Sequence, residues 1–147
     1  MLKTELIHPE LLRSLASAGH GSRILIADGN YKFSTGVNPA ADRVFLNLTP
    51  GVVDAPTALA AIMSAVPVES MTLMETEPPV PAVPEIFSTY TDVAAAAGRP
   101  DLGYEQINKH DFYDLAKDSG TALVVATAET AIYANILLTI GVVHPPA

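Results

Sequence analysis

Short apolar runs alternate with amphipathic segments along most of this chain. Residues 24–26, Ile-Leu-Ile, form an unbroken apolar run, which is typical of a strand covered on both faces by helices. The run 121–127 is rich in β-branched residues and predicts another buried strand. Runs of similar character predict strands at 44–48, 68–74 and 133–142, although the length of the last segment would also allow a helix.

Helical spacing of apolar residues occurs between these runs. Pro9 suits the first turn of a helix, and leucines recur at helical spacing until Gly19, which predicts a helix over 9–18. Asp54 is a suitable N-cap for a second helix, which ends before Pro67. Further helices are predicted at 85–97, with Ile86, Tyr90, Val93 and Ala97 on the buried side, and at 109–117.

The connections between these elements are polar or contain glycine and proline. Residues 30–38 and 103–108 are predicted loops, and the four prolines of 77–84 exclude that segment from a sheet interior. Glu77, at the start of the proline segment, is expected to be a charge at the rim. Strands that alternate with helices indicate the α/β class, so we expect one domain over 1–147 with a three-layer α/β/α sandwich.

The composition adds an expectation about assembly. The 147 residues are 49% hydrophobic and only 16% charged, which is more apolar than a monomer of this length requires. Some of this apolar surface is therefore expected to lie between subunits of a homo-oligomer. Eight basic and sixteen acidic side chains give a net charge of −8, and the basic residues are scattered, so nucleic acid is not an expected partner.

The chain contains no cysteine, which excludes disulfides, thiol nucleophiles and thiolate metal sites and is compatible with a reducing compartment. Residues 1–8 carry charge and lack the continuous apolar core of a secretory signal. The longest apolar stretch, 131–143, is interrupted by Asn135 and Thr139 and is shorter than the roughly 20 residues that a membrane helix needs. We expect a cytoplasmic protein without a membrane partner.

Two residues that flank the run 24–26 carry candidate chemistry. His20 lies between two glycines, and an imidazole can move protons at neutral pH, although it could equally complement the dipole of the preceding helix. Asp28 follows the strand at the end where open α/β sheets bind ligands, or it caps its own Asp-Gly turn. The histidines lack metal-ligand spacing, and neither a phosphate-binding glycine loop nor a nucleophile-elbow serine is present. The pattern indicates acid/base chemistry.

The last apolar segment holds another candidate pair. If 133–142 is a strand, Tyr133 and Asn135 point to the same face, and each needs a hydrogen-bond partner. They could bind a ligand or bond to neighbouring loops. Lys109 and His110, at the start of the short helix, are expected to be solvated unless the site uses one of them.

Two segments together carry a resemblance to a known family. The first is Gly19-His20-Gly21 with the following strand and Asp28, and the second is Tyr133-Ala134-Asn135 with Ile136-Leu137-Leu138 and Gly141-Val142. The opening His8-Pro9-Glu10-Leu11-Leu12 and the Phe112-Tyr113 pair add to them. The chain resembles the RbsD/FucU sugar mutarotases, which include L-fucose mutarotase and D-ribose pyranase. The resemblance lies in these segments, in the order in which they follow one another and in the length of the chain.

The resemblance implies an enzyme that interconverts sugar anomers without a cofactor or metal. It also implies a ring assembly, often a decamer, with sites between subunits. By resemblance His20 is the proton donor, and Asp28, Lys109 and Tyr133-Ala134-Asn135 bind the monosaccharide, with the alanine acting through its backbone. Lys109 stands where the family usually has Arg or His, so it keeps the charge but loses the planar geometry of Arg.

Smaller features bear on the substrate. Gly21 and Asn30 are closer to the fucose branch than to the ribose branch, whereas Asp28-Gly29-Asn30-Tyr31-Lys32 lacks the proline that usually follows this aromatic residue, and the loop 118–120 is slightly long. We expect an L-fucose-like substrate. The alternatives are a D-ribose-type pyranase, a non-catalytic sugar-binding module, and an ordinary structural α/β oligomer.

The spacing of the two candidate residues predicts where a complete site forms. His20 and Asp28 are eight residue steps apart, which corresponds to roughly 25 Å along a strand at about 3.3 Å per step. One sugar cannot touch both at that separation. Either the Gly21-Ser22 turn folds His20 back, or His20 of one subunit meets Asp28 of the next; we favour the second, because it also explains the excess apolar surface.

Overall fold

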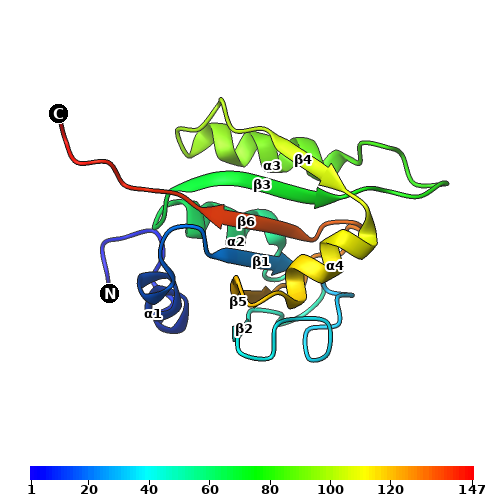
Figure 1. Cartoon of the computed structure of the whole chain (residues 1–147), viewed down its shortest axis with the longest axis horizontal. Helices are drawn as coiled ribbons and strands as arrows, with labels where there is room; N and C mark the ends of the chain where they lie inside the picture. The colour runs from blue at the N-terminus through cyan, green and yellow to red at the C-terminus, as the bar shows by residue number, and fades with distance from the viewer.

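A computed structural model describes residues 1–147 and contains one six-stranded sheet (Figure 1). The strands are β1 (Arg23–Ala27), β2 (Asp42–Phe45), β3 (Val68–Met74), β4 (Tyr104–Ile107), β5 (Thr121–Ala126) and β6 (Ile136–Ile140). Their order is β2-β5-β1-β6-β3-β4, and β6 runs antiparallel to both of its neighbours while the other pairs are parallel. The carboxyl ends of the parallel strands and the start of β6 therefore meet at one edge.

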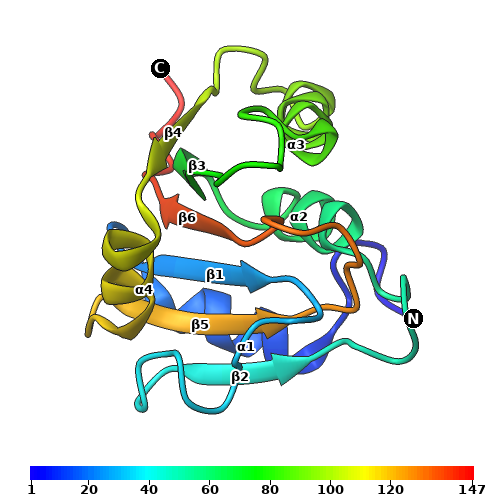
Figure 2. The same cartoon turned by 90° about the vertical axis from the view of Figure 1, so that its right-hand side faces the viewer.

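Helices cover both faces of this sheet. They are α1 (Pro9–Ala18), α2 (Ala55–Met63), α3 (Glu85–Ala96) and α4 (Lys109–Lys117). Figure 2 shows α2 and α3 on one side of the sheet and α4 on the other. Leu11 of α1 shares a core cluster with Leu59 of α2 and Phe87 of α3, whereas Phe112 of α4 belongs to a second cluster. The predicted three-layer α/β/α sandwich is confirmed.

Strand β1 is buried on both faces. Ile24 and Ile26 belong to the cluster under α1, α2 and α3, and Leu25 and Ala27 belong to the cluster under α4. All four side chains are 0% exposed. Burial of each large aliphatic side chain contributes about 1.5–3 kcal/mol to stability. The unbroken apolar run at 24–26 predicted this position correctly, because a strand with one solvated face would alternate apolar and polar residues.

Capping residues explain where the helices begin. The side chains of His8, Asp54 and Asn108 each accept a hydrogen bond from the backbone N–H three residues later, at 3.4, 2.9 and 3.0 Å. Each bond satisfies one of the four N–H groups that a helix start leaves without a partner. The helices predicted at 9–18 and 109–117 are confirmed, and so is the strand predicted at 68–74.

Near the sheet edges the bounds of one predicted strand and the assignment of one predicted loop are wrong. The strand expected at 44–48 ends at Phe45, because the chain then turns and the Leu48 N–H donates to the Val52 carbonyl at 2.8 Å. The loop expected at 103–108 contains β4, which pairs in parallel with β3 at the edge of the sheet. This strand has only four residues, and none of them is fully buried, as is common in edge strands.

The last strand begins later than predicted. It starts at Ile136, and Tyr133 lies before it in the left-handed region with φ 59°. Tyr133 and Asn135 therefore do not alternate along one strand, and the argument that placed them on one face is wrong. They still line the same cavity, because the turn before β6 directs both side chains to it.

Helix α3 packs against the core with a face that only partly matches the predicted one. Its buried residues are Phe87, Tyr90 and Ala94, whereas Ala97 is the exposed C-cap. Tyr90 is buried as predicted, and Ile86 and Val93 are partly buried against the same core cluster, so three of the four predicted residues hold. Phe87 contacts Tyr104 of β4, a strand that the sequence did not predict. At 12 residues α3 is the longest helix, and no helix combines the length and the apolar character needed to span a membrane.

Candidate functional site

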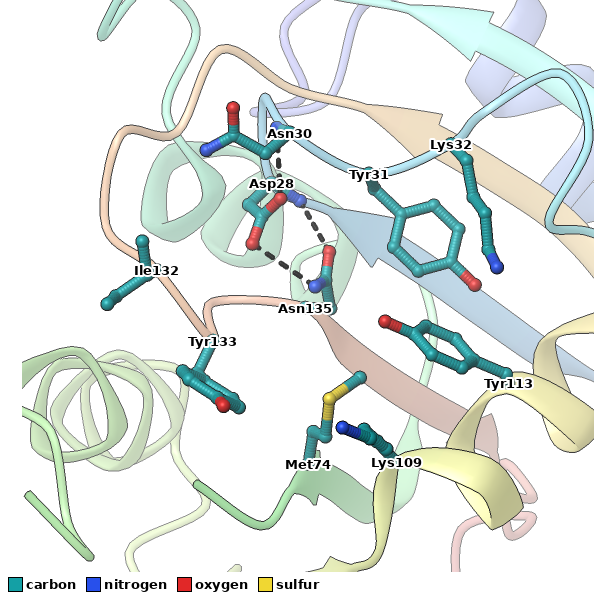
Figure 3. Close-up of a pocket in the computed structure, with 10 residues that line it drawn as sticks. All are labelled: Asp28, Asn30, Tyr31, Lys32, Met74, Lys109, Tyr113, Ile132, Tyr133 and Asn135. Atoms are coloured by element: carbon teal, nitrogen blue, oxygen red, sulfur yellow. Dashed lines mark hydrogen bonds between the residues drawn. The ribbon is translucent and has the colours of Figure 1, made fainter. Parts of the chain in front are cut away.

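A pocket of about 400 Å³ lies at the edge where the parallel strands end (Figure 3). Each wall comes from the end of a strand or the segment beside it: Asp28 follows β1, Met74 ends β3, Lys109 begins α4 after β4, and Asn135 precedes β6. The lining residues are Asp28, Asn30, Tyr31, Lys32, Met74, Lys109, Tyr113, Ile132, Tyr133 and Asn135. Small-molecule pockets of open α/β sheets are typically found at this edge, and their volumes start at about 300 Å³.

Asp28 and Asn135 hold each other in place at the base of the pocket. The Asn135 side-chain amide donates to the Asp28 carboxylate at 3.1 Å, and its carbonyl oxygen accepts from the Asp28 backbone N–H at 2.8 Å. The Asn30 backbone N–H donates to the other Asp28 oxygen at 3.0 Å. Both residues are buried, since Asp28 is 4% exposed and Asn135 is 7% exposed. These hydrogen bonds form within the chain and need no ligand.

Burial changes the acidity of Asp28. Removal from water raises the pKa of its carboxyl above the ordinary value, and the nearby Glu129 charge acts in the same direction. Hydrogen bonds from backbone N–H groups, of which Asn30 gives the largest effect, partly offset this rise. The carboxylate is therefore a hydrogen-bond acceptor in a partly desolvated place, where an acceptor is more effective than it is in water.

The turn at Tyr133-Ala134 is fixed from two sides. The Tyr90 hydroxyl of α3 donates to the Ala134 carbonyl, and both residues are 0% exposed. The Glu77 backbone N–H donates to the Tyr133 hydroxyl oxygen at 3.3 Å. Together these bonds hold Tyr133 in its left-handed conformation. The Ala134 carbonyl is occupied by Tyr90, and Ala134 does not line the pocket.

Lys109 stands at the pocket wall with a partner of its own. Its ammonium group forms an ion pair with the Glu77 carboxylate at 2.8 Å, which raises the pKa of Lys109. His110 is exposed and does not line the pocket, so Lys109 is the basic residue at this position that faces the site. Glu77, expected to be a rim charge, is exposed and contacts two pocket residues.

His20 lies at the opposite end of β1. Its Nε2 is 3.1 Å from a carboxylate oxygen of Glu69 at the start of β3, and its side chain is 58% exposed. The Gly21 N–H donates to the carbonyl of Ile140, the last residue of the antiparallel β6, which places this turn at the amino end of β1. The Gly21-Ser22 turn does not fold His20 back, and within one chain His20 and Asp28 are not brought together.

Some pocket residues were missed by the sequence reasoning. Tyr31 and Lys32 were placed in a loop and Tyr113 in a segment of the family resemblance, and none was given a role in the site, yet all three line the pocket. A usable signal was available for Tyr113, because it lies four residues after Lys109 on the same helix and so shares its face. No periodicity could place Tyr31 and Lys32, since the loop that carries them has none.

Glu129 is a second buried acid that the sequence reasoning missed. Its two carboxylate oxygens accept from the backbone N–H groups of Ala55 at 3.2 Å and Ala131 at 2.8 Å. Its carbonyl accepts from the Gly29 N–H at 2.9 Å, directly after Asp28. Glu129 therefore ties the start of α2 to both loops that carry the pocket residues, and it also lines a neighbouring cavity of about 400 Å³.

Comparison with known proteins gives a consistent result over nearly the whole chain. Residues 1–143 match the RbsD / FucU transport protein family. The chain is 32% identical to fucose mutarotase of Danio rerio, covering 93% of this chain and 90% of that protein. It is also 32% identical to D-ribose pyranase of Paracidovorax citrulli (strain AAC00-1), covering 97% and 98%.

The fold is similar to that of a solved relative. The crystal structure of fucose mutarotase in complex with L-fucose from Streptococcus pneumoniae superposes with a TM-score of 0.80 at 30% identity, covering 97% of this chain and 100% of that one. The fucose mutarotase and the D-ribose pyranase above match at the same identity. The preference for the fucose branch therefore stays a prediction.

Proposed function

Because the chain belongs to the RbsD/FucU family, we propose that it is a sugar mutarotase, an isomerase that interconverts the anomers of a monosaccharide without a cofactor. The observation that carries this proposal is the mutually bonded Asp28 and Asn135 at a pocket of about 400 Å³. An L-fucose-like sugar is the substrate that we favour, by analogy with the L-fucose complex of the Streptococcus pneumoniae relative.

The reaction requires proton transfer at two oxygens of the sugar. The ring oxygen gains a proton while the anomeric hydroxyl loses one, and the ring bond breaks to give an open-chain aldehyde. The aldehyde group then rotates, and the ring closes on its other face with the reverse proton transfers. General acid/base groups that assist such steps contribute typically about 10² to 10⁴ in rate each.

The pocket residues suit the binding part of this reaction. The Asp28 carboxylate can accept hydrogen bonds from sugar hydroxyls, and the fixed Asn135 keeps it oriented. The Tyr133 oxygen already accepts from the Glu77 N–H, so its own hydrogen is free to be donated to a sugar oxygen. Lys109 can donate to a hydroxyl while its charge stays balanced by Glu77. The carbonyl of Ala134 shapes the turn through its bond to Tyr90, and its backbone N–H favours the charged form of Asp28 and so lowers the pKa of that carboxyl.

His20 is the group that we propose as proton donor and shuttle. Since it lies at the other end of β1, the proposal requires His20 of one copy to approach the pocket of a neighbouring copy. A ring of identical subunits with head-to-tail contacts repeats such a site at every interface. The exposure of His20 leaves its imidazole accessible to a second chain.

Two alternative functions would use the same pocket. The similarity to a D-ribose pyranase supports D-ribose as the substrate. For this sugar, the same ring opening leads to exchange between the pyranose and furanose forms. A non-catalytic sugar-binding module would use the same acceptors without proton transfer. All three predict sugar binding, so binding alone does not separate them.

An NMR screen of anomer exchange separates these functions. We would measure magnetisation transfer between anomeric protons for L-fucose, D-ribose, D-galactose and L-rhamnose, with enzyme-free samples as blanks. We expect the largest rate above the blank for L-fucose. If D-ribose showed the largest rate, the result would favour the pyranase. If saturation transfer from protein to sugar showed binding but no sugar exchanged its anomers, the result would contradict the mutarotase proposal.

A further inference from the structure

Glu129 is a buried acid, 8% exposed, that does not line the pocket of Asp28 and Asn135. One of its carboxylate oxygens accepts from the Ala55 N–H at the start of α2 at 3.2 Å, and the other accepts from the Ala131 N–H at 2.8 Å. We propose that Glu129 is a positioning residue, which fixes the Asp28 and Asn135 side chains without touching the sugar. The inference rests on the proposed function, because it assigns a further residue to the same site.

The segment that carries Glu129 holds the Asp28 turn on both sides. Before Asp28, the Ala27 carbonyl accepts from the Thr127 N–H at 3.1 Å and from the Thr127 hydroxyl at 2.7 Å. After Asp28, the Gly29 N–H donates to the Glu129 carbonyl at 2.9 Å. This contact is close, since a Cβ at Gly29 would lie 3.0 Å from the same carbonyl oxygen. A shift of Glu129 would therefore move the backbone that carries the Asp28 carboxylate.

The Glu129 carboxylate holds the other half of the pocket. Its bond to the Ala131 N–H fixes the residue from which the chain enters the pocket wall. In Figure 3 the chain continues from Ile132 to Asn135, whose amide donates to the Asp28 carboxylate at 3.1 Å. The two loops of the pocket therefore cannot separate unless a hydrogen bond to Glu129 or the bond between Asp28 and Asn135 breaks.

A carboxylate suits this position better than an amide. The two N–H groups come from different segments, and a carboxylate offers one acceptor oxygen to each of them. A glutamine has one oxygen and one donating NH2 group, so it would leave one of the two N–H groups without an acceptor. Glu129→Gln therefore breaks one of the two links while it keeps the shape of the side chain.

The charge of Glu129 also acts on Asp28. Burial raises the pKa of the Asp28 carboxyl most, and the Glu129 charge raises it further. Burial raises the pKa of Tyr31 and Tyr90 as well, so neither hydroxyl is charged at neutral pH. Removal of the Glu129 charge should therefore lower the pKa of Asp28. The other charged groups near the two acids are Asp54 at the start of α2, and Lys32 and the Glu77-paired Lys109 at the pocket.

Sugar affinity tests the positioning role. We would measure Kd for L-fucose and D-ribose by NMR titration of the full-length protein, together with anomer exchange at saturating sugar. Glu129→Gln should raise Kd about tenfold through the lost hydrogen bond, while exchange at saturation changes less. Asp54→Asn makes the same change in charge, keeps a good helix cap and should leave Kd unaltered. An unaltered Kd in folded Glu129→Gln would overturn the inference.

The titration of the Asp28 carboxyl is a readout that a loss of stability alone would not move. Its ¹³C chemical shift across pH gives the pKa of Asp28 without any sugar. This pKa should be lower in Glu129→Gln than in wild type, and it should change less in Asp54→Asn. Equal values in wild type and Glu129→Gln would contradict the inference.

A double variant shows whether Glu129 acts through Asp28. Because Asp28→Asn already weakens sugar binding, the addition of Glu129→Gln should weaken it little further. Losses that add in full would contradict an action through Asp28.

Gly29→Ala tests the same contact without any change in charge, even if Glu129→Gln does not fold. The added Cβ would push the Asp28 turn away from the Glu129 carbonyl, so sugar binding should weaken. Gly103→Ala, where a Cβ meets nothing within 4 Å, is the matched control. Equal affinity in the two variants would contradict the inference.

The proposed function fails on a different result. If the wild-type protein exchanges the anomers of no sugar, the mutarotase proposal fails, and the Asp28 titration still decides whether Glu129 acts on Asp28. If sugars exchange but Glu129→Gln binds and titrates like wild type, the inference fails while the mutarotase proposal stands.

Discussion

The two ends of strand β1 differ in how completely one chain equips them. At the carboxyl end Asp28 is buried, receives hydrogen bonds from Asn30 and Asn135, and faces a pocket. At the amino end His20 is 58% exposed and contacts one side chain, Glu69, itself 46% exposed. The carboxyl end is organised for binding before a ligand arrives, whereas the amino end presents a reactive group on an open surface.

This difference explains why neither end suffices for catalysis in our proposal. A buried carboxylate with fixed donors orients a sugar, but it lacks a group that releases and recovers protons near neutral pH. An exposed imidazole exchanges protons readily, but nothing in its own chain holds a sugar beside it. Contact between two copies would combine these properties, and the following predictions test each half.

Replacement of His20 should have the largest effect on activity. We expect His20→Gln to slow anomer exchange by about 10² to 10⁴, since it removes one general acid/base group. Sugar affinity and the circular dichroism spectrum should change little, because His20 is exposed and its side chain hydrogen-bonds to the exposed Glu69. His144→Gln, in the exposed C-terminal segment, is the matched control. Exchange at the unaltered rate in His20→Gln would remove His20 from the mechanism.

Replacement of Asp28 should chiefly weaken sugar binding. Asp28→Asn keeps the shape but loses a charged acceptor, which is worth about 1.5–3 kcal/mol and so about 10- to 100-fold in KM.

The reaction should also respond to pH. Since burial raises the pKa of Asp28, the wild-type protein should lose activity on acidification at a higher pH than an ordinary aspartate would cause. Rates at a series of pH values test this, and an acid limb unchanged in Asp28→Asn would contradict it.

The same pKa shift fixes the sign of a stability effect. The Asp28 carboxyl binds its proton more readily in the folded chain than in the unfolded chain, where its pKa is near 3.8. The Asp28 contribution to the free energy of unfolding is therefore greatest below that value and is lost as pH rises through the folded pKa. Urea denaturation of wild type and Asp28→Asn across this range measures the difference in slope.

The contrast between the two ends also shows what the sequence could predict. The apolar run at 24–26 and its flanking His20 and Asp28 stand in one continuous stretch, so spacing alone separated the two residues correctly. Contacts such as Asp28 with Asn135 join residues 107 positions apart, and no local pattern carries them. The left-handed Tyr133 was missed for the same reason, because bonds from Tyr90 and Glu77 impose that turn.

Mixing of inactive variants tests whether the two ends meet between copies. Equal amounts of His20→Gln and Asp28→Asn should regain activity after subunit exchange, because about one quarter of the interfaces would then combine an intact His20 with an intact Asp28. Recovery toward about one quarter of the wild-type rate is the expected result. Confirmed mixing by native mass spectrometry without any recovery would show that the site does not form between neighbours.

Removal of Asn135 should affect stability more than any change near His20. Asn135→Ala deprives the buried Asp28 of one donor and its N–H of an acceptor. Unsatisfied buried groups of this kind cost about 1–3 kcal/mol each, so the urea midpoint should fall clearly at neutral pH. A midpoint equal to wild type would mean that the Asp28 end is less rigid than its hydrogen bonds indicate.

Glu69→Gln should have the smallest effect, and it sharpens the comparison from the other end. Gln can still accept from His20, and even a fully charged exposed pair contributes at most about 1 kcal/mol to stability. The urea midpoint should stay close to wild type, and anomer exchange should change by about twofold. If exchange fell as far as in His20→Gln, Glu69 would be part of the proton relay. The amino end of β1 would then carry its own catalytic pair, and the neighbouring copy would contribute only the pocket that binds the sugar.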